Sequence, residues 1–145
     1  MGLIPAEDNE EMLAKFEPMR AHFEKKMGMP VKVFQATDYA GVIEAMKRDR
    51  VDIAWFGPLS YVLAEQEAEA EAFAVGVKDG GTSTYQSMIF VPADSPAKSI
   101  ADLKGADVAF VDPASTSGSL VPSYMAGVGT KMINPRQGML FREWS

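Results

Sequence analysis

The sequence contains no cysteine and only one histidine among its 145 residues. Without cysteine, the chain can form no disulfide, no thiolate metal site and no cysteine nucleophile. A single histidine cannot build a zinc centre, which takes three or four protein ligands. His22 is also distant in sequence from Ser117, and no Gly-x-Ser-x-Gly motif is present, so a serine hydrolase is not supported.

Long hydrophobic runs are also missing. No stretch approaches the ~20 apolar residues that a membrane-spanning helix requires. Residues 1–6 lack the basic start and the apolar stretch of a secretion signal. If the protein is exported, we therefore expect its leader to be missing from this sequence.

Positive charge is scarce. Lys and Arg number 14 against 20 Asp and Glu, which gives a formal net charge of −6 and a pI near 4.8. Proteins bind nucleic acids and anionic membranes through basic surfaces, so this composition argues against both kinds of partner. A small-molecule ligand fits better. If that ligand is an anion, local donors must attract it within a Debye length of about 10 Å.

Short apolar runs alternate with helical periods along the chain, and this alternation predicts an α/β fold. In the first half we expect three strands, at residues 2–5, 31–35 and 51–56. A helix follows each of them. Asp38 is the predicted N-cap of the second helix, and Gly57-Pro58 opens the third. Pro18 predicts a kink or a restart inside the first, whose apolar stripe is Met12, Phe16, Met19, Phe23 and Met27.

The second half continues the pattern. We expect three further strands, at residues 73–77, 84–91 and 108–111. A turn at Asp79-Gly80-Gly81 separates the first two, and Ser99 with Asp102 forms a short capped turn. The last helix is expected from Ser117 to about Lys131. The glutamates that precede this half indicate a solvated helix face rather than a metal site; they are Glu65, Glu67, Glu69 and Glu71.

A hydroxyl-rich loop, Asp112-Pro113-Ala114-Ser115-Thr116-Ser117-Gly118-Ser119, lies between a predicted strand and the last helix. Free amides at a helix start carry the positive end of its dipole, so an oxyanion can bind there without Lys or Arg. Three neighbouring hydroxyls complete such a shell, and Gly118 keeps the first turn open for a close approach. The same residues also suit ordinary helix capping, with one serine as the cap and the others as bystanders. The position at the carboxyl end of a strand favours the ligand site.

Two tyrosines become informative beside this loop. Tyr39 starts a helix directly after a strand, at the same rim of the predicted sheet. Its hydroxyl can donate to an anion there, or its ring can simply pack half-buried on the helix start. Tyr85 lies near the start of a predicted strand, and its side chain can face either a cleft or the core. The residues alone leave both alternatives open.

Four stretches form a specific combination: Asp38–Met46 (DYAGVIEAM), Val51–Ser60 (VDIAWFGPLS), Tyr85–Val91 and Asp112–Pro122 (DPASTSGSLVP). In their order and spacing they resemble the phosphonate- and phosphite-binding proteins of ABC transporters. The resemblance implies a periplasmic-binding fold of type II, in which two lobes close on the ligand. It also implies that the phosphonyl oxygens are held by backbone amides at the start of the last helix and by the side chains of Tyr39, Tyr85, Ser115, Thr116 and Ser117. Gly57 is implied to line the opposite side of the cleft.

The resemblance covers only the leading part of that family's fold. Residues 1–91 correspond to the N-terminal part of lobe 1, and residues 92–145 correspond to the start of a truncated lobe 2. The family's later histidine contact, the acidic residues that recognise the organic end of the ligand and the return to lobe 1 have no counterpart. We therefore expect exposed sheet edges and a homo-oligomer or an exchange of elements; a monodisperse monomer that unfolds cooperatively would refute this.

The function implied by the resemblance is that of a solute-binding component of an ABC-type uptake system for a phosphonate, phosphite or phosphate-like oxyanion. Its partners are the anion and a transporter permease, it has no cofactor, and it is not an enzyme. Its implied location is the periplasm, or the outer surface of a Gram-positive cell through a lipid anchor. A sensor domain of the same fold and a truncated fragment that binds nothing and self-associates stay open as alternatives. An enzyme such as a phosphatase would need a metal cluster or a base near the serines, and the sequence offers neither.

Overall fold

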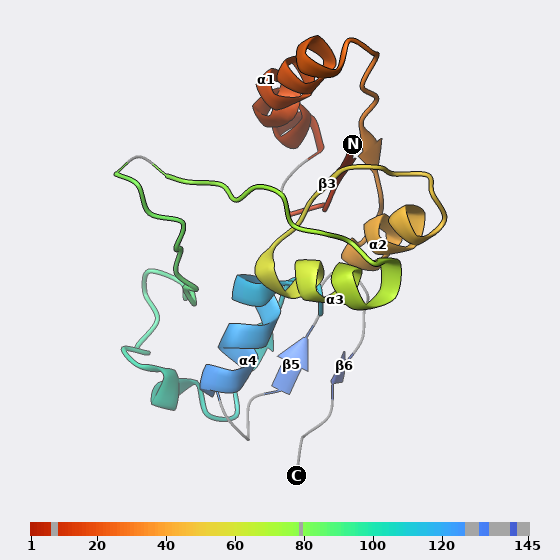
Figure 1. Ribbon diagram of the computed structural model, residues 1–145. Helices are drawn as coiled ribbons and strands as arrows, with labels where there is room; N and C mark the ends of the chain where they lie inside the picture. Colours follow the sequence, from red (N-terminus) through yellow and green to blue (C-terminus); the bar gives the residue numbers. More distant parts are fainter. Residues whose placement is uncertain (7–8, 79, 127–130, 134–139, 142–145) are drawn as a thin grey trace. The chain divides into compact units, whose positions relative to one another are not determined.

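The computed structural model describes residues 1–6, 9–78, 80–126, 131–133 and 140–141 (Figure 1). The fold is α/β, and the chain divides into two compact units, Met1–Glu71 and Ala72–Ser145. The elements of the first unit are β1 (Gly2–Leu3), α1 (Asn9–Met27), β2 (Phe34–Gln35), α2 (Tyr39–Lys47), β3 (Ala54–Trp55) and α3 (Pro58–Ala68). Those of the second unit are η1 (Ile100–Leu103), β4 (Asp107–Ala109), η2 (Thr116–Leu120), α4 (Val121–Ala126), β5 (Lys131–Ile133) and β6 (Leu140–Phe141).

The sheet of the first unit is parallel, and β1 lies at its centre in the order β2-β1-β3. Gly2 pairs with Phe34 on one side and with Ala54 on the other. A Cβ at Gly2 would lie 2.8 Å from Val42 Cγ1, so only glycine fits at this point of the sheet. The three strands predicted in this half are present, although each is only two residues long. Parallel strands joined by helices are the arrangement that the alternating sequence pattern predicts.

One hydrophobic cluster of the first unit forms around the apolar stripe of α1. Met12 of α1 and Leu3 of β1 are almost completely buried. Three further residues of the stripe pack against this cluster and are partly buried: Phe16, Met19 and Phe23. Met27 is 44% exposed, so the predicted stripe is confirmed as far as Phe23 and wrong for its last member.

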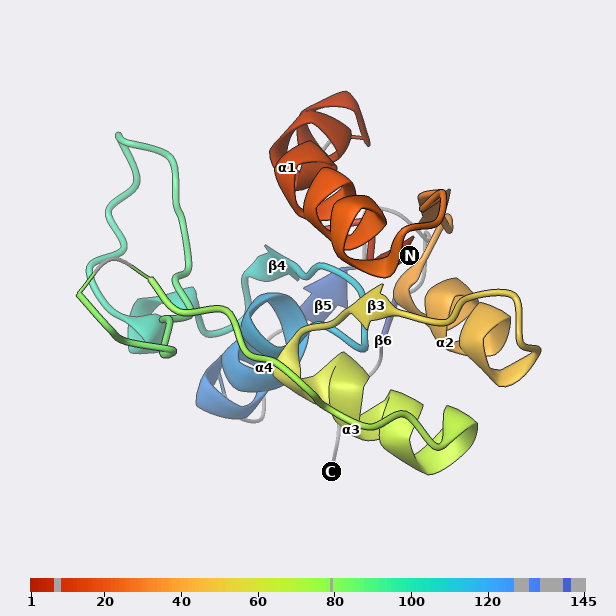
Figure 2. The same ribbon diagram turned by 45° about the horizontal axis from the view of Figure 1, so that its top comes forward.

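Pro18 lies inside α1, which runs uninterrupted across it (Figure 2). A proline cannot donate to the carbonyl four residues earlier, which is that of Ala14. Both residues are exposed, so water can reach that carbonyl. Because α1 is continuous across Pro18, the restart of the helix predicted there as one of two outcomes does not occur.

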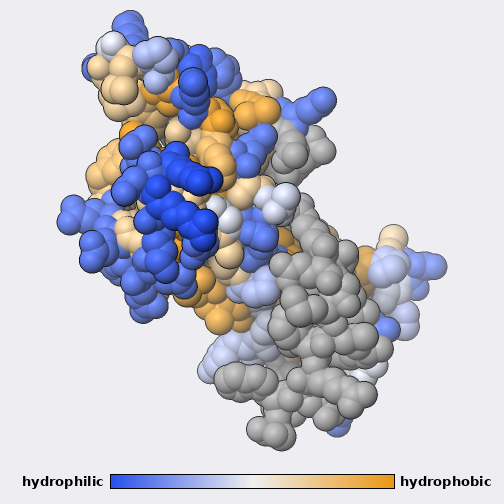
Figure 3. Space-filling model, turned by 90° about the vertical axis from the view of Figure 1, so that its right-hand side faces the viewer, coloured by the Kyte–Doolittle hydropathy of each residue, from blue (hydrophilic) through white to orange (hydrophobic). Residues whose placement is uncertain are grey.

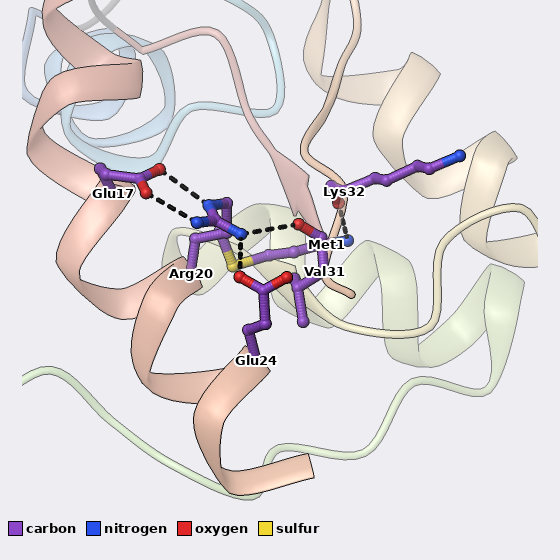
Figure 4. A network of polar contacts seen from close by, with 6 residues as sticks. All are labelled: Met1, Glu17, Arg20, Glu24, Val31 and Lys32. Atoms are coloured by element: carbon purple, nitrogen blue, oxygen red, sulfur yellow. Dashed lines mark hydrogen bonds and ion pairs between the residues drawn. The ribbon is translucent and has the colours of Figure 1, made fainter. Parts of the chain in front are cut away.

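Arg20 connects α1 to the segment that leads into β2 (Figure 4). Its guanidinium pairs with Glu17 at 2.8 Å and with Glu24 at 2.6 Å, and it donates to the Val31 carbonyl oxygen at 3.2 Å. The hydrogen bond from Arg20 lowers the pKa of the Glu17 carboxyl, and the two carboxylates raise the pKa of Arg20. Arg20 and Glu17 therefore stay ionised, and Arg20 links the first helix to the segment before β2.

The helices α2 and α3 pack against each other and begin at the predicted caps. Asp38 Oδ1 accepts a hydrogen bond from the Gly41 amide at 2.7 Å, and Gly57 caps α3 with a proline as the next residue. The four glutamates at residues 65–71 are exposed as predicted, but α3 ends at Ala68, so the predicted helix face is wrong for Glu69 and Glu71. In the described part of the chain, no group of acidic or histidine side chains could hold a metal ion.

Between α3 and η1 the described residues form no helix or strand. The strands predicted at 73–77 and 84–91 are therefore wrong, because an apolar alternation becomes a strand only beside a partner strand. Of the turn predicted between them, Asp79 lies outside the described residues; beside it, the Gly81 amide donates to the Lys78 carbonyl oxygen at 3.0 Å. Apolar side chains of both segments are exposed, by 69% at Phe73. Hydrophobic side chains are visible among hydrophilic ones on the molecular surface (Figure 3).

The remaining elements of the second unit follow the predicted capped turn. The Asp102 carboxylate accepts from the amides of Lys98 and Ser99 and from the Ser99 hydroxyl, and these bonds lower its pKa. β4 pairs parallel with β5, and β5 pairs antiparallel with β6. Lys131 begins β5, so the prediction that the last helix reaches Lys131 is wrong.

The boundary between the compact units follows Glu71, ahead of the lobe boundary that the resemblance places at residue 91. The compact units are defined by contacts within the chain, whereas the lobes are defined by the topology of the family. The assignment of residues 1–91 and 92–145 to two lobes therefore stays a prediction. Within the described ranges, every helix is too short or too polar to cross a membrane.

Candidate functional site

The hydroxyl-rich loop leads from β4 into η2, a π-helix that continues as α4. This start lies within one residue of the predicted one. The Leu120 amide donates to the Ser115 carbonyl oxygen at 3.0 Å, and the Val121 amide donates to that of Thr116. In a π-helix each amide donates to the carbonyl five residues earlier, rather than four as in an α-helix. One more amide at the start of a π-helix therefore has no acceptor within the helix. The loop therefore ends in a set of backbone donors.

Ser115 is the N-cap of this helix. Its Oγ accepts a hydrogen bond from the Gly118 amide at 3.1 Å, and its side chain is largely buried. The capping interpretation of the loop thus holds for this residue. A hydroxyl that accepts one bond still carries a proton to donate, so capping and ligand binding are compatible at Ser115.

Ser117 offers donors that the helix does not use. Among the described residues, neither its amide nor its hydroxyl has a hydrogen-bond partner, and the residue is partly exposed. Thr116 beside it is also partly exposed, whereas Ser119 is buried. The alternative in which a serine next to the cap binds no ligand therefore suits Ser119 better than Ser117.

Gly118 is required by packing. A Cβ there would lie 2.5 Å from Val111 Cγ2 and 2.9 Å from Ser115 Oγ. The Val111 amide also donates to the Gly118 carbonyl oxygen at 2.9 Å. This packing is a structural reason for glycine; the predicted open approach for an oxyanion at Gly118 stays a prediction. The glycine lets the helix start close against the residues that follow β4.

The loop is electrically neutral apart from one carboxylate. Residues 112–119 contain no Lys or Arg, and the Asp112 carboxylate accepts from the Ala114 amide at 2.8 Å. Any attraction for an anion in this loop must come from hydroxyls and amides. These groups can replace the hydration shell of an oxyanion, and none of them is a strong base or a metal ligand.

Two predicted site residues belong to the first unit. Tyr39 is the first residue of α2 and is 4% exposed, so its ring is more deeply buried than the predicted packing alternative requires. The Gly57 amide donates to Ser60 Oγ at 3.0 Å, and the Ser60 hydroxyl donates back to the Gly57 carbonyl oxygen at 3.1 Å. Ser60 is fully buried and was not singled out in the sequence, although a serine at the third helical position signals such a cap.

Tyr85 belongs to the second unit and is 45% exposed. Two residues further along, the Ser87 hydroxyl donates to the Ser117 carbonyl oxygen at 2.6 Å. The structure thus joins the segment that carries Tyr85 to the hydroxyl-rich loop. No local signal in the sequence indicates Ser87, because its partner is 30 residues away. The roles of Tyr39 and Gly57 beside this loop stay predictions.

Comparisons with known proteins support the resemblance stated above. Residues 1–131 match the family described as ABC transporter, phosphonate, periplasmic substrate-binding protein. The chain is 41% identical over 127 residues to the phosphonates-binding periplasmic protein of Escherichia coli (strain K12), covering 85% of this chain and 38% of that protein. It is 40% identical over 126 residues to the phosphate-import protein PhnD of Mycolicibacterium smegmatis, covering 85% and 39%.

The fold is similar to that of a solved relative as well. A crystal structure of a binding protein component of an ABC phosphonate transporter from Pseudomonas aeruginosa superposes with a TM-score of 0.79 at 36% identity, covering 86% of this chain and 43% of that one. The chain spans 38–39% of the length of the two curated relatives. The family match includes all four stretches that carry the resemblance, and the α/β fold agrees with it. The chain therefore belongs to the family of periplasmic substrate-binding proteins of phosphonate ABC transporters, which bind solutes for transport rather than catalyse reactions.

Proposed function

We propose that this chain binds a tetrahedral phosphorus oxyanion and serves as the solute-binding component of an ABC uptake system. The observation that carries the proposal is family membership over residues 1–131. Relatives at 41% and 40% identity are named for phosphonates and for phosphate, so the ligand class is a phosphonate or a close inorganic analogue. A transporter permease is the partner that receives the ligand, and the periplasm is the place of binding.

The donors of the hydroxyl-rich loop support the chemistry of this proposal. The amide and hydroxyl of Ser117, the hydroxyl of Thr116 and the proton of Ser115 are neutral donors at the start of one helix. Each charge-assisted hydrogen bond contributes about 1.5–3 kcal/mol. Since micromolar binding corresponds to about 8 kcal/mol, five such bonds reach that range even after the cost of ordering the site. We assign the remaining contacts to Tyr39, Tyr85 and Gly57.

Calorimetric titration of the chain with four anions tests the proposal: phosphite, methylphosphonate, 2-aminoethylphosphonate and phosphate. At least one is expected to bind with micromolar affinity. Thr116→Val removes one donor at nearly constant shape and is expected to weaken that binding about tenfold. Ser83→Ala, which removes an exposed hydroxyl elsewhere in the second unit, is the matched control and is expected to change nothing. Equal affinity of the Thr116→Val variant would remove this residue from the site.

A chain that binds nothing and self-associates is the second candidate, and one observation favours it. Large apolar side chains are exposed between α3 and η1, among them Phe73, Val75 and Phe90. Exposed apolar surface of this kind drives association. Light scattering on the calorimetry sample separates the two functions: an assembly that shows no heat of binding for any of the four anions would contradict the transport proposal.

A further inference from the structure

The hydrogen-bond register of η2 is interrupted at Ser117. Leu120 donates to the Ser115 carbonyl oxygen, and Val121 donates to that of Thr116. The next bond in this register would run from residue 122 to the Ser117 carbonyl oxygen. Residue 122 is proline, which has no N–H. The helix register therefore cannot supply this carbonyl with its donor.

Ser87 supplies a donor from a distant part of the second unit. Its hydroxyl reaches the Ser117 carbonyl oxygen at 2.6 Å across 30 residues of sequence. The segment that contains Ser87 has no strand ladder to hold it, and its apolar neighbours are exposed. The hydrogen bond therefore ties an otherwise loosely held segment to the residue whose own amide and hydroxyl have no partner in the described chain.

We infer that Ser87 is a positioning residue for the oxyanion site, and that it sets the place of Tyr85 relative to Ser117. Consecutive Cα atoms are 3.8 Å apart, so the Cα of Tyr85 lies within about 7.6 Å of that of Ser87. A hydrogen bond at Ser87 thus limits how far the tyrosine can move from the helix start. The inference rests on the proposed function, because it concerns the same ligand.

The structure also indicates why Pro122 and Ser87 act together. An ordinary residue at position 122 could donate its amide to Ser117 in the π register and would compete with the Ser87 hydroxyl. Proline removes that competitor, so the Ser117 carbonyl remains open to the incoming hydroxyl. Proline is therefore the residue at position 122 that suits this link.

A double-mutant cycle with methylphosphonate tests the inference on the full chain. Ser87→Ala is expected to raise the Kd about tenfold, which is the scale of one hydrogen bond. Ser87→Thr keeps the hydroxyl and is expected to stay within about threefold of the unsubstituted chain. In a Tyr85→Phe background, Ser87→Ala is expected to raise the Kd by less than about threefold, because the hydroxyl that Ser87 positions is already gone.

The outcomes separate this inference from the proposed function. If the unsubstituted chain binds none of the four anions, the proposed function fails. If that chain binds and Ser87→Ala binds equally well, only the role of Ser87 is overturned. Independent, multiplicative effects of Ser87→Ala and Tyr85→Phe would also overturn it, since a merely structural hydrogen bond would not couple to the tyrosine hydroxyl. Thermal unfolding of each variant is recorded beside the titrations, and coupling between folded variants supports the inference.

Discussion

Replacing Ser117 with aspartate is expected to weaken methylphosphonate binding about a hundredfold or more. The new carboxylate would lie beside the amide that the described residues leave without a partner, where the oxyanion is proposed to bind. Two unit charges about 4 Å apart repel by about 4 kcal/mol at an effective dielectric constant of about 20, which corresponds to roughly a thousandfold in Kd before salt screening. Calorimetric titration measures the loss.

Ser117→Asn is the matched control, because asparagine has the shape of aspartate without its charge. It is expected to weaken binding by less than about tenfold. The stability of the two variants sharpens the comparison: a carboxylate in the first turn of a helix is favourable by about 0.3–1 kcal/mol. Ser117→Asp should therefore fold at least as well as the unsubstituted chain while binding far less. Equal affinities of the two variants would contradict the assignment of Ser117.

Gly118→Ala is expected to destabilise the second unit by about 1–3 kcal/mol, the usual cost of overpacking. Its methyl group would lie 2.5 Å from Val111 Cγ2 and 2.9 Å from Ser115 Oγ, so the loop or the helix start must shift. Since Ser115 is the N-cap, the shift also disturbs the donors of the site, and weaker binding should accompany the lower stability. Urea unfolding of the two proteins measures the difference.

Val111→Ala measures how much of this cost comes from overlap with Val111 Cγ2. It removes Cγ2, the atom that the new methyl group would approach most closely, although Val111 Cβ at 2.7 Å stays in place. The cost of Gly118→Ala should therefore fall in part when Val111 is alanine. An unchanged cost in that background would show that the contacts with Val111 Cβ at 2.7 Å and Ser115 Oγ at 2.9 Å, rather than the one with Cγ2, require glycine.

Local signals in the sequence were sufficient for several features of the fold. Asp38, Gly57 and Ser99 act as helix caps where they were predicted, because a cap depends on residues three or four positions apart. The hydroxyl-rich loop and the helix start beside it were also predictable, since both depend on a short stretch of polar residues. The apolar stripe of α1 follows from its spacing for the same reason.

Features that depend on distant partners could not be predicted. The segments 73–77 and 84–91 have the apolar alternation of strands, yet a strand forms only with a neighbour, and that neighbour is not specified locally. The bond from Ser87 to Ser117 depends on a π register and a proline 35 residues after Ser87, and the close contact of Gly118 depends on how tightly the loop folds back. The site was predicted by its donors, whereas the groups that hold those donors became evident only in three dimensions.

The most direct test of the central claim, that the helix start at residues 115–119 binds the oxyanion, is a titration followed through backbone amides. Nitrogen-15 NMR spectra of the chain would be recorded with increasing methylphosphonate. We predict saturable shifts of the amide of Ser117 and its neighbours in this loop, with shifts at Tyr85 and Ser87 as well, and their loss in Ser117→Asp. Binding detected by calorimetry with no change at residues 115–119 would contradict the claim.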